Sequence, residues 1–221
     1  MTQERSQLVA SLGRKGIGAA TLAAFERVPR ETFLPKDQRG RAYEDRPLAI
    51  GFGQTCSQPW IVAVALQALE LRPGASVLEV GAGSGYLAAL LRAAGASRVV
   101  AIEIVPVLAA RARSNLNRAG VSGVVVTVGD GRRGAPGDAP FDAVIVSAAG
   151  ASVPSALANQ VADGGKLVLP LQRPQEERLW CLTRNGPDWI QQDLGECRFV
   201  PLLGQSEEAG AGADPIGQVL P

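Results

Sequence analysis

The sequence contains no histidine among its 221 residues. Histidine is the commonest general base in enzymes, and it activates the nucleophile in Ser-His and Cys-His catalytic sites. Its absence excludes all of these designs together. Any reaction that this protein catalyses must therefore proceed without an imidazole.

Cysteine is also scarce. Cys56, Cys181 and Cys197 are odd in number and far apart, and no two of them form a Cys-x-x-Cys pair. This pattern provides neither a disulfide framework nor the usual spacing of zinc ligands. We therefore expect three reduced thiols and no bound metal.

Long apolar runs and an excess of charge of either sign are absent as well. No window approaches the roughly 18 consecutive apolar residues of a membrane span, and residues 1–11 lack the apolar core of a secretory signal. The 22 basic and 21 acidic residues nearly balance, so no large basic field is available for nucleic acid. We expect a cytoplasmic, monomeric protein with no membrane or nucleic-acid partner.

The most informative stretch that is present is Ser76–Tyr86, in which an apolar run leads into Gly81, Gly83 and Gly85. The segment after it, Leu87–Ala94, has the composition of a helix, so the stretch predicts a strand, a tight loop and a helix. This is the form of a nucleotide-type cofactor site, where glycines let the main chain approach the ligand. A glycine-rich turn that serves packing alone is the alternative.

Two details distinguish this loop from a dinucleotide site. A dinucleotide fingerprint has its third glycine three residues after the second, but Tyr86 occupies that position. Glu79 lies within the apolar strand, where an isolated charge is costly unless it is paired. A cationic ligand would provide the pair.

Acidic residues also end the next two predicted strands. Glu103 follows Gly81 by about 20 residues, the spacing at which folds of this topology place the acid that binds ribose hydroxyls. Asp130 lies between two glycines, where it can accept a hydrogen bond from the adenine amino group while Gly131 leaves room for the ring. A solvated acid at Glu103 and a plain Gly-Asp-Gly turn are the alternatives.

The rest of the chain alternates apolar runs with amphipathic segments, which predicts an α/β fold with a doubly wound, mostly parallel sheet. Further strands are predicted over Arg98–Ile104, Gly123–Val128, Phe141–Ser147 and Lys166–Leu171. Helices are predicted over Pro106–Asn117 and Pro154–Val161, from Pro59 to about Leu71, and twice within residues 4–27. Residues 43–59 are expected to form an ordered loop, with Ser57 or Gln58 capping the Pro59 helix.

The last part of the chain changes character. Arg178–Thr183 and Trp189–Phe199 predict an antiparallel hairpin around Asn185-Gly186-Pro187-Asp188, which brings the sheet to seven strands. We expect one domain over residues 1–205, with N-terminal helices and a loop in 1–58 and a Rossmann-like sheet in 59–205. Residues 206–221 are rich in Gly and Ala and are expected to be a flexible tail.

Two resemblances make the interpretation specific. Glu-x-Gly-x-Gly-x-Gly at Glu79–Gly85 resembles motif I of the class I methyltransferases, whose S-adenosylmethionine is cationic. Three further segments resemble the protein-L-isoaspartate O-methyltransferases. They are Val28-Pro29-Arg30-x-x-Phe33, Ala42–Leu48 and Gly53-Gln54-Thr55-x-Ser57-Gln58-Pro59. Enzymes of that family esterify the free α-carboxylate of isoaspartyl residues in damaged proteins and peptides, which initiates repair.

The resemblance implies a role for each matching position. Ser57 corresponds to the active-site serine, Gln54 and Thr55 to the acceptor pocket, and Asp45, Ala49 and Ile50 to its approach. The implied cofactor residues are Glu79, Gly81, Gly83, Gly85, Glu103, Ile104, Asp130, Gly131 and Ser147. Val200-Pro201-Leu202 matches a segment that closes over the site. Cys56 and Ala49 depart from the family pattern, which bears on the shape of the pocket.

This chemistry needs no histidine, because a carboxylate with a pKa of about 4 is already ionised at neutral pH. Three alternatives remain open at this point. A diverged relative would methylate an aspartate in a precursor peptide, a binding module would sense S-adenosylmethionine without catalysis, and an oxidoreductase would bind a nicotinamide cofactor instead.

Overall fold

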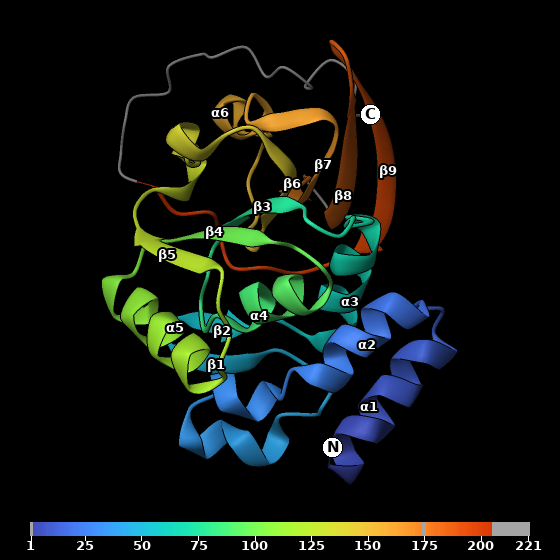
Figure 1. Ribbon diagram of the computed structural model, residues 1–221, viewed down its shortest axis with the longest axis vertical. Coiled ribbons are helices and arrows are strands. Elements are labelled where there is room, and N and C mark those ends of the chain that lie inside the picture. Colours follow the sequence, from blue (N-terminus) through green and yellow to red (C-terminus); the bar gives the residue numbers. More distant parts are fainter. Residues whose placement is uncertain (1, 174–175, 205–221) are drawn as a thin grey trace.

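The computed structural model describes residues 2–173 and 176–204, and the expected flexible tail at 206–221 lies outside them. Figure 1 shows a central sheet with helices on both sides. The helices are α1 Gln3–Arg14, α2 Ala19–Arg27, α3 Pro59–Ala68, α4 Tyr86–Ala93, α5 Pro106–Arg118 and α6 Ser155–Ala158, with 3-10 helices η1 Arg30–Phe33, η2 Lys36–Arg41, η3 Gly131–Arg133 and η4 Pro136–Asp138. The strands are β1 Leu48–Gly51, β2 Gln54–Cys56, β3 Ser76–Val80, β4 Arg98–Glu103, β5 Val124–Val128, β6 Phe141–Val146, β7 Val161–Gln172, β8 Glu177–Asn185 and β9 Asp188–Glu196.

The main sheet has seven strands in the order β5-β4-β3-β6-β7-β8-β9. The pairs from β5 to β7 are parallel, and β8 and β9 continue the sheet in antiparallel pairs. This confirms the predicted fold class and the terminal hairpin. β3 lies between β4 and β6. The chain therefore continues from β3 to β4 and β5 on one side of it and to β6 and β7 on the other. Such a switch point is where open α/β sheets bind ligands.

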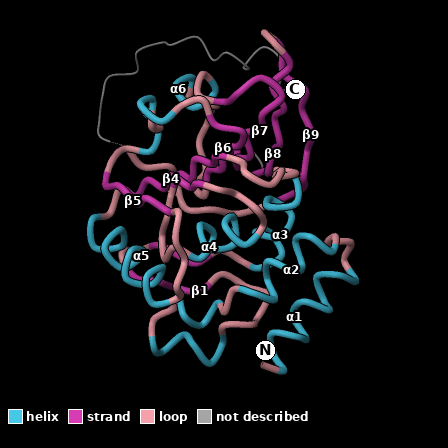
Figure 2. The backbone as a smooth tube through the Cα atoms, viewed as in Figure 1, coloured by secondary structure: helices cyan, strands magenta, loops and turns pink. Residues whose placement is uncertain are grey.

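Both faces of the sheet are covered, which explains why its strands are continuous apolar runs (Figure 2). Val77 and Val99 point into the cluster that contains α3, α4 and α5. Their neighbours Leu78 and Val100 point into a second cluster with Leu157 of α6. The two clusters fix the sheet from both sides and hold the ends of its strands in place.

Two helices end earlier than predicted, and the last strand, β9, ends at Glu196 instead of Phe199. Helix α6 ends at Ala158, and Val161 already begins β7 because it pairs with Phe141. Helix α3 ends at Ala68 instead of continuing to Leu71, and Glu70 adopts a left-handed φ of 47°. In both places local helix composition is outweighed by the path that the chain must take into the sheet.

The segment predicted as an ordered loop contains a β-hairpin instead. β1 and β2 pair in antiparallel fashion, with Gly51 opposite Gln54. Phe52 and Gly53 form the turn with φ of 57° and 71°, the combination that a two-residue turn matching strand twist requires. Sequence reasoning missed it because phenylalanine is an unusual residue at a positive φ.

The start of helix α3 is capped by a residue distant in sequence. Gln58 is the N-cap residue, but no side chain at that position forms a capping hydrogen bond, so the predicted cap by Ser57 or Gln58 is wrong. Asp45 Oδ1 instead accepts a hydrogen bond from the Trp60 amide at 2.8 Å, and its Oδ2 lies 2.7 Å from Lys15 Nζ. The hydroxyl of Ser57 is therefore not used as a cap and can form a hydrogen bond with another group.

Replacing Asp45 by alanine tests this cap. We expect Asp45→Ala to lower the free energy of unfolding by about 1 kcal/mol, the usual cost of losing a helix N-cap. Chemical denaturation monitored by circular dichroism measures the change. Asp37→Ala, at an exposed position of η2, is the matched control; an equal effect of both substitutions would contradict the assignment.

Candidate functional site

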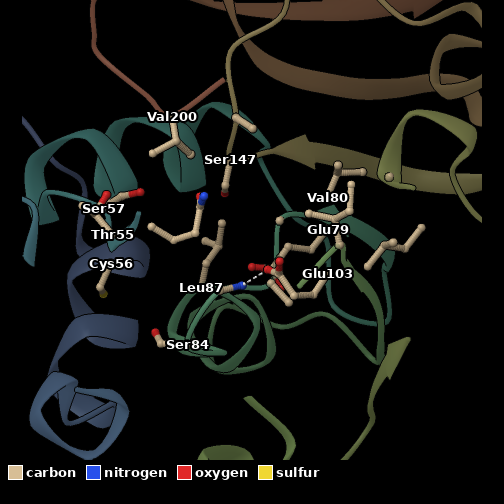
Figure 3. Close-up of a pocket in the computed structure, with 18 of the residues that line it drawn as sticks. Thr55, Cys56, Ser57, Glu79, Val80, Ser84, Leu87, Glu103, Ser147 and Val200 are labelled. Atoms are coloured by element: carbon tan, nitrogen blue, oxygen red, sulfur yellow. Dashed lines mark hydrogen bonds between the residues drawn. The ribbon is translucent and has the colours of Figure 1, made fainter. Parts of the chain in front are cut away.

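A cavity lies at the carboxyl ends of β3, β4 and β6. Its walls come from β2, the glycine loop after β3, the end of β4, the turn after β6 and the segment 200–203. Figure 3 shows Glu79 and Glu103 at one end of it and Thr55 and Ser57 at the other. The site therefore brings together parts of the chain that are far apart in sequence.

Glu79 is the main electrostatic feature of this cavity. Its side chain is 0% exposed, and neither carboxylate oxygen has a hydrogen-bond partner among the described residues. Burial, and to a lesser extent the nearby carboxylate of Glu103, raises the pKa of Glu79 well above its ordinary value. A buried carboxylate without a partner is costly, so this position fits a ligand with a positive charge.

Glu103 joins the glycine loop to the start of α5. Its Oε2 accepts a hydrogen bond from the Gly83 amide at 2.7 Å, shown dashed in Figure 3, and its Oε1 accepts one from the Val105 amide at 2.9 Å. The residue is 5% exposed, so the alternative of a solvated acid is wrong. Each oxygen has a second lone pair, and both remain able to accept from a hydroxyl group.

The glycines of the site have two different functions. A Cβ at Gly131 would lie 2.3 Å from Val80 Cγ1, so only glycine allows the chain to pass the strand here. Gly85 has a φ of 82° and begins α4, and a Cβ there would lie 3.2 Å from the carbonyl oxygen of Ala112. Gly85 does not line the cavity, and the structure places it in helix packing.

Asp130 also lies outside the cavity lining. Its Oδ1 accepts a hydrogen bond from the Arg132 amide at 3.0 Å, and its Oδ2 lies 2.7 Å from Arg132 Nη2. The carboxylate thus caps η3, as the Gly-Asp-Gly turn alternative predicts. Its neighbour Gly131 does line the cavity. After β5 it is therefore the main chain at Gly131, and not the side chain of Asp130, that faces the cavity.

Of the predicted acceptor residues, Gln54, Thr55 and Ser57 line the cavity and the other three do not. Asp45 caps α3, as described above. Ile50 packs on the glycine loop, with its Cδ1 3.3 Å from where a Cβ of Gly83 would lie. Ala49 faces outward from β1 and is exposed. The predicted cofactor residues that line the cavity are Glu79, Gly81, Gly83, Glu103, Ile104, Gly131 and Ser147.

The segment 200–203 covers the cavity next to Ser147. The Ala149 amide donates to the Val200 carbonyl and the Leu202 amide donates to the Ala149 carbonyl, both at 2.8 Å. This main-chain pairing holds Val200 over the site in Figure 3. It agrees with the predicted closure of the site by Val200-Pro201-Leu202.

Two arginines contact the hairpin next to the site, and the sequence did not single out either of them as a functional residue. Arg30 is 0% exposed and donates hydrogen bonds to five main-chain carbonyls around the hairpin. Arg111 Nη1 donates to the Ile50 carbonyl at 3.1 Å, and its Cζ lies 5.5 Å from the centroid of the Phe52 ring. Arg111 gives no sequence signal, because it lies in a helix with several other exposed basic residues.

The sheet order, the glycine loop and the unpaired acid at the end of β3 define a class I S-adenosylmethionine-dependent methyltransferase. The chain belongs to the protein-L-isoaspartate(D-aspartate) O-methyltransferase family, whose model matches residues 3–207. It is therefore an enzyme whose cofactor is S-adenosylmethionine. Within the described ranges, no helix is long and apolar enough to cross a membrane.

Individual relatives agree with this assignment. The chain is 53% identical over 186 residues to a protein-L-isoaspartate O-methyltransferase of Methylorubrum populi, covering 84% of this chain and 87% of the relative. It is 47% identical to one of Methanoculleus marisnigri, covering 92% and 93%. A solved structure of that name is 29% identical, with a TM-score of 0.84 over 90% of this chain and 66% of the other. A Plasmodium falciparum protein solved with S-adenosyl-L-homocysteine has the same fold, at a TM-score of 0.79, 24% identity and a coverage of 92% and 99%.

The burial of Glu79 predicts a dependence of cofactor affinity on pH. Because its pKa is raised in the ligand-free protein, lowering the pH through that value adds a proton and removes the charge that pairs with an ammonium. We expect the affinity for S-adenosylhomocysteine to fall as the pH is lowered through that raised pKa. Glu79→Gln should lower it tenfold to about a hundredfold, the range for a hydrogen bond to a charged group, and should flatten the pH profile.

The same substitution should stabilise the ligand-free protein at neutral pH. A group with a raised pKa contributes stability below its unfolded pKa and loses it as the pH rises through the folded one. Glu79→Gln removes that loss. Isothermal titration calorimetry and thermal unfolding between pH 5 and 8 measure both effects, with Glu4→Gln on the exposed face of α1 as control. Unchanged affinity in Glu79→Gln would refute the role of Glu79.

Proposed function

We propose that this enzyme transfers a methyl group from S-adenosylmethionine to the free α-carboxylate of L-isoaspartyl residues in damaged proteins and peptides, with Ser57 orienting the acceptor. The observation that supports this most is the division of one cavity into two ends. Glu79 and Glu103 are at one end, and the hydroxyls of Thr55 and Ser57 are at the other (Figure 3). One end suits a cation and the other an anionic acceptor.

The reaction needs no general base. S-adenosylmethionine supplies an electrophilic methyl group, so that the carboxylate oxygen forms a bond to carbon while the carbon–sulfur bond breaks and its electron pair stays on sulfur. An acceptor with a pKa of about 4 is ionised at neutral pH. The protein contributes alignment of the reacting groups, which is worth about 7 kcal/mol or more in good geometry.

Ser57 is suited to hold the acceptor. Its hydroxyl has no hydrogen-bond partner within the described part of the chain, and α3 does not need it as a cap because Asp45 serves the Trp60 amide. The hydroxyl can donate one hydrogen bond to the acceptor carboxylate without attacking it. Thr55 and Gln54 then shape the same end of the cavity.

The cofactor end is assigned by the same reasoning. Glu79 pairs with the ammonium group, Glu103 accepts from the ribose hydroxyls, and Gly131 leaves room for the adenine ring next to Asp130. Gly81, Gly83, Ile104 and Ser147 form the walls. Support comes from the unpaired oxygens of Glu79 and from the position of Gly131 in the cavity lining.

We also propose that the enzyme acts as a monomer in the cytoplasm. Cys56, Cys181 and Cys197 are all free and buried. Free thiols suit a reducing compartment. The acceptor is a polypeptide, with neither nucleic acid nor a membrane as partner.

Isomeric peptides test the proposed activity. The enzyme should convert an isoaspartyl peptide and radiolabelled S-adenosylmethionine to a base-labile methyl ester, and the same peptide with ordinary aspartate should give none. Release of volatile methanol after base treatment measures the product. Turnover of the aspartyl isomer would indicate a relative with a different acceptor, and binding of the cofactor without turnover would indicate a sensing module.

Substitution of Ser57 tests its role within that reaction. Ser57→Ala should lower kcat about tenfold to a hundredfold, the value of one hydrogen bond to a charged group, with the affinity for S-adenosylhomocysteine unchanged. Ser114→Ala, at an exposed position on α5, is the control. Wild-type kcat in Ser57→Ala would show that the hydroxyl does not orient the acceptor.

A further inference from the structure

Arg30 is the largest fully buried side chain of the described protein, with an exposed fraction of 0%. Among the described residues no carboxylate pairs with it, and its guanidinium donates to main-chain carbonyls instead. Burial of a cation is costly without compensating contacts. A residue kept in this state must contribute something that a neutral side chain at the same place would not.

The five carbonyls that Arg30 binds belong to two segments of the chain. One is residues 42–46, before β1, and the other is residues 56–57, where β2 ends. Nη1 donates to Ala42 and Glu44, at 2.9 and 3.2 Å. Nη2 donates to Arg46, Cys56 and Ser57, at 3.1, 3.2 and 2.9 Å. One planar group therefore joins the entry of the hairpin to its exit, and its last contact is the main chain of Ser57 itself.

The guanidinium also lies against the cofactor half of the molecule. Arg30 Cζ is 6.0 Å from the ring centroid of Tyr86, the first residue of α4 after the glycine loop. Phe25 and Phe33 pack against the same ring, with centroids 6.3 and 5.6 Å away. Arg30 is thus a common contact of the acceptor segment and of the element that begins at the cofactor loop.

We propose that Arg30 is a positioning residue for methyl transfer: it fixes the main chain at Cys56 and Ser57 relative to the cofactor loop, so that the Ser57 hydroxyl meets the acceptor carboxylate. The inference rests on the role of Ser57 proposed above. A displacement of about 1 Å in a reacting geometry costs about a hundredfold in rate. Arg30 reaches substrate only through Ser57 and is not itself catalytic.

Lysine at position 30 is the informative substitution. Lysine retains the positive charge, but its single ammonium has three donors and no planar fork, so it cannot hold five carbonyls in this arrangement. Arg30→Lys should lower kcat for an isoaspartyl peptide about tenfold to a hundredfold, with the affinity for S-adenosylhomocysteine within twofold of wild type. Arg113→Lys is the matched control, because Arg113 also donates to a main-chain carbonyl, that of Val126, away from the acceptor end.

A double-mutant cycle separates positioning from general loss of structure. We expect the double variant Arg30→Lys, Ser57→Ala to be no more than about twofold slower than Ser57→Ala alone, because residues acting through one contact are not additive. Equal loss in both backgrounds would overturn the inference while leaving the role of Ser57 intact. Wild-type kcat in Ser57→Ala would overturn the proposed role of Ser57 and this inference with it.

A second measurement needs no variant and covers the case in which Arg30→Lys does not fold. If Arg30 fixes this segment, the amides of residues 42–57 should exchange with deuterium slowly in the wild-type enzyme without cofactor, and S-adenosylhomocysteine should slow them by less than about threefold. Exchange at the intrinsic rate of an unprotected amide would show that the segment is not fixed, and would overturn the proposal.

Discussion

The buried carboxylate of Glu79 is the constraint on which the site depends. It stands at the end of the central strand, 0% exposed and without a partner among the described residues. A charge in this place destabilises the ligand-free protein, which supports the proposal that Glu79 pairs with a cationic ligand. Glu103 close by deepens the negative potential and at the same time holds the glycine loop by the Gly83 amide. The same buried carboxylate thus destabilises the ligand-free protein and suits a cationic ligand.

The acceptor end follows the opposite principle. It contains no acid of its own among the cavity-lining residues from β2 and the following turn, only hydroxyl, amide and thiol groups. Behind this end, Arg30 donates hydrogen bonds to carbonyls on both sides of the hairpin, and Asp45 caps α3. A carboxylate acceptor needs no proton removed, so a site without histidine loses nothing. The protein's contribution to catalysis is geometric.

The sequence predicted the parts of this arrangement that depend on short-range patterns. Apolar runs located the strands, and Glu79, Gly81 and Glu103 were found at the cofactor end because acids and glycines at strand ends are unusual. The hairpin was missed since its turn uses Phe52 at a positive φ. The cap of α3 was assigned to Ser57 or Gln58, the neighbours in sequence, whereas Asp45 reaches it through the fold. Arg30 stood within a recognised motif, but only packing shows that its charge faces main chain.

The cover at residues 200–203 has a consequence for how the family can diversify. It is attached to the turn after β6 through amides and carbonyls, with Ala149 serving as both donor and acceptor. These main-chain bonds do not depend on side-chain identity, although Leu202 also packs against the second core cluster. Val200 and Leu203 line the cavity. Substitutions at these two positions would therefore change the shape of the cavity without removing the main-chain bonds that hold the segment in place.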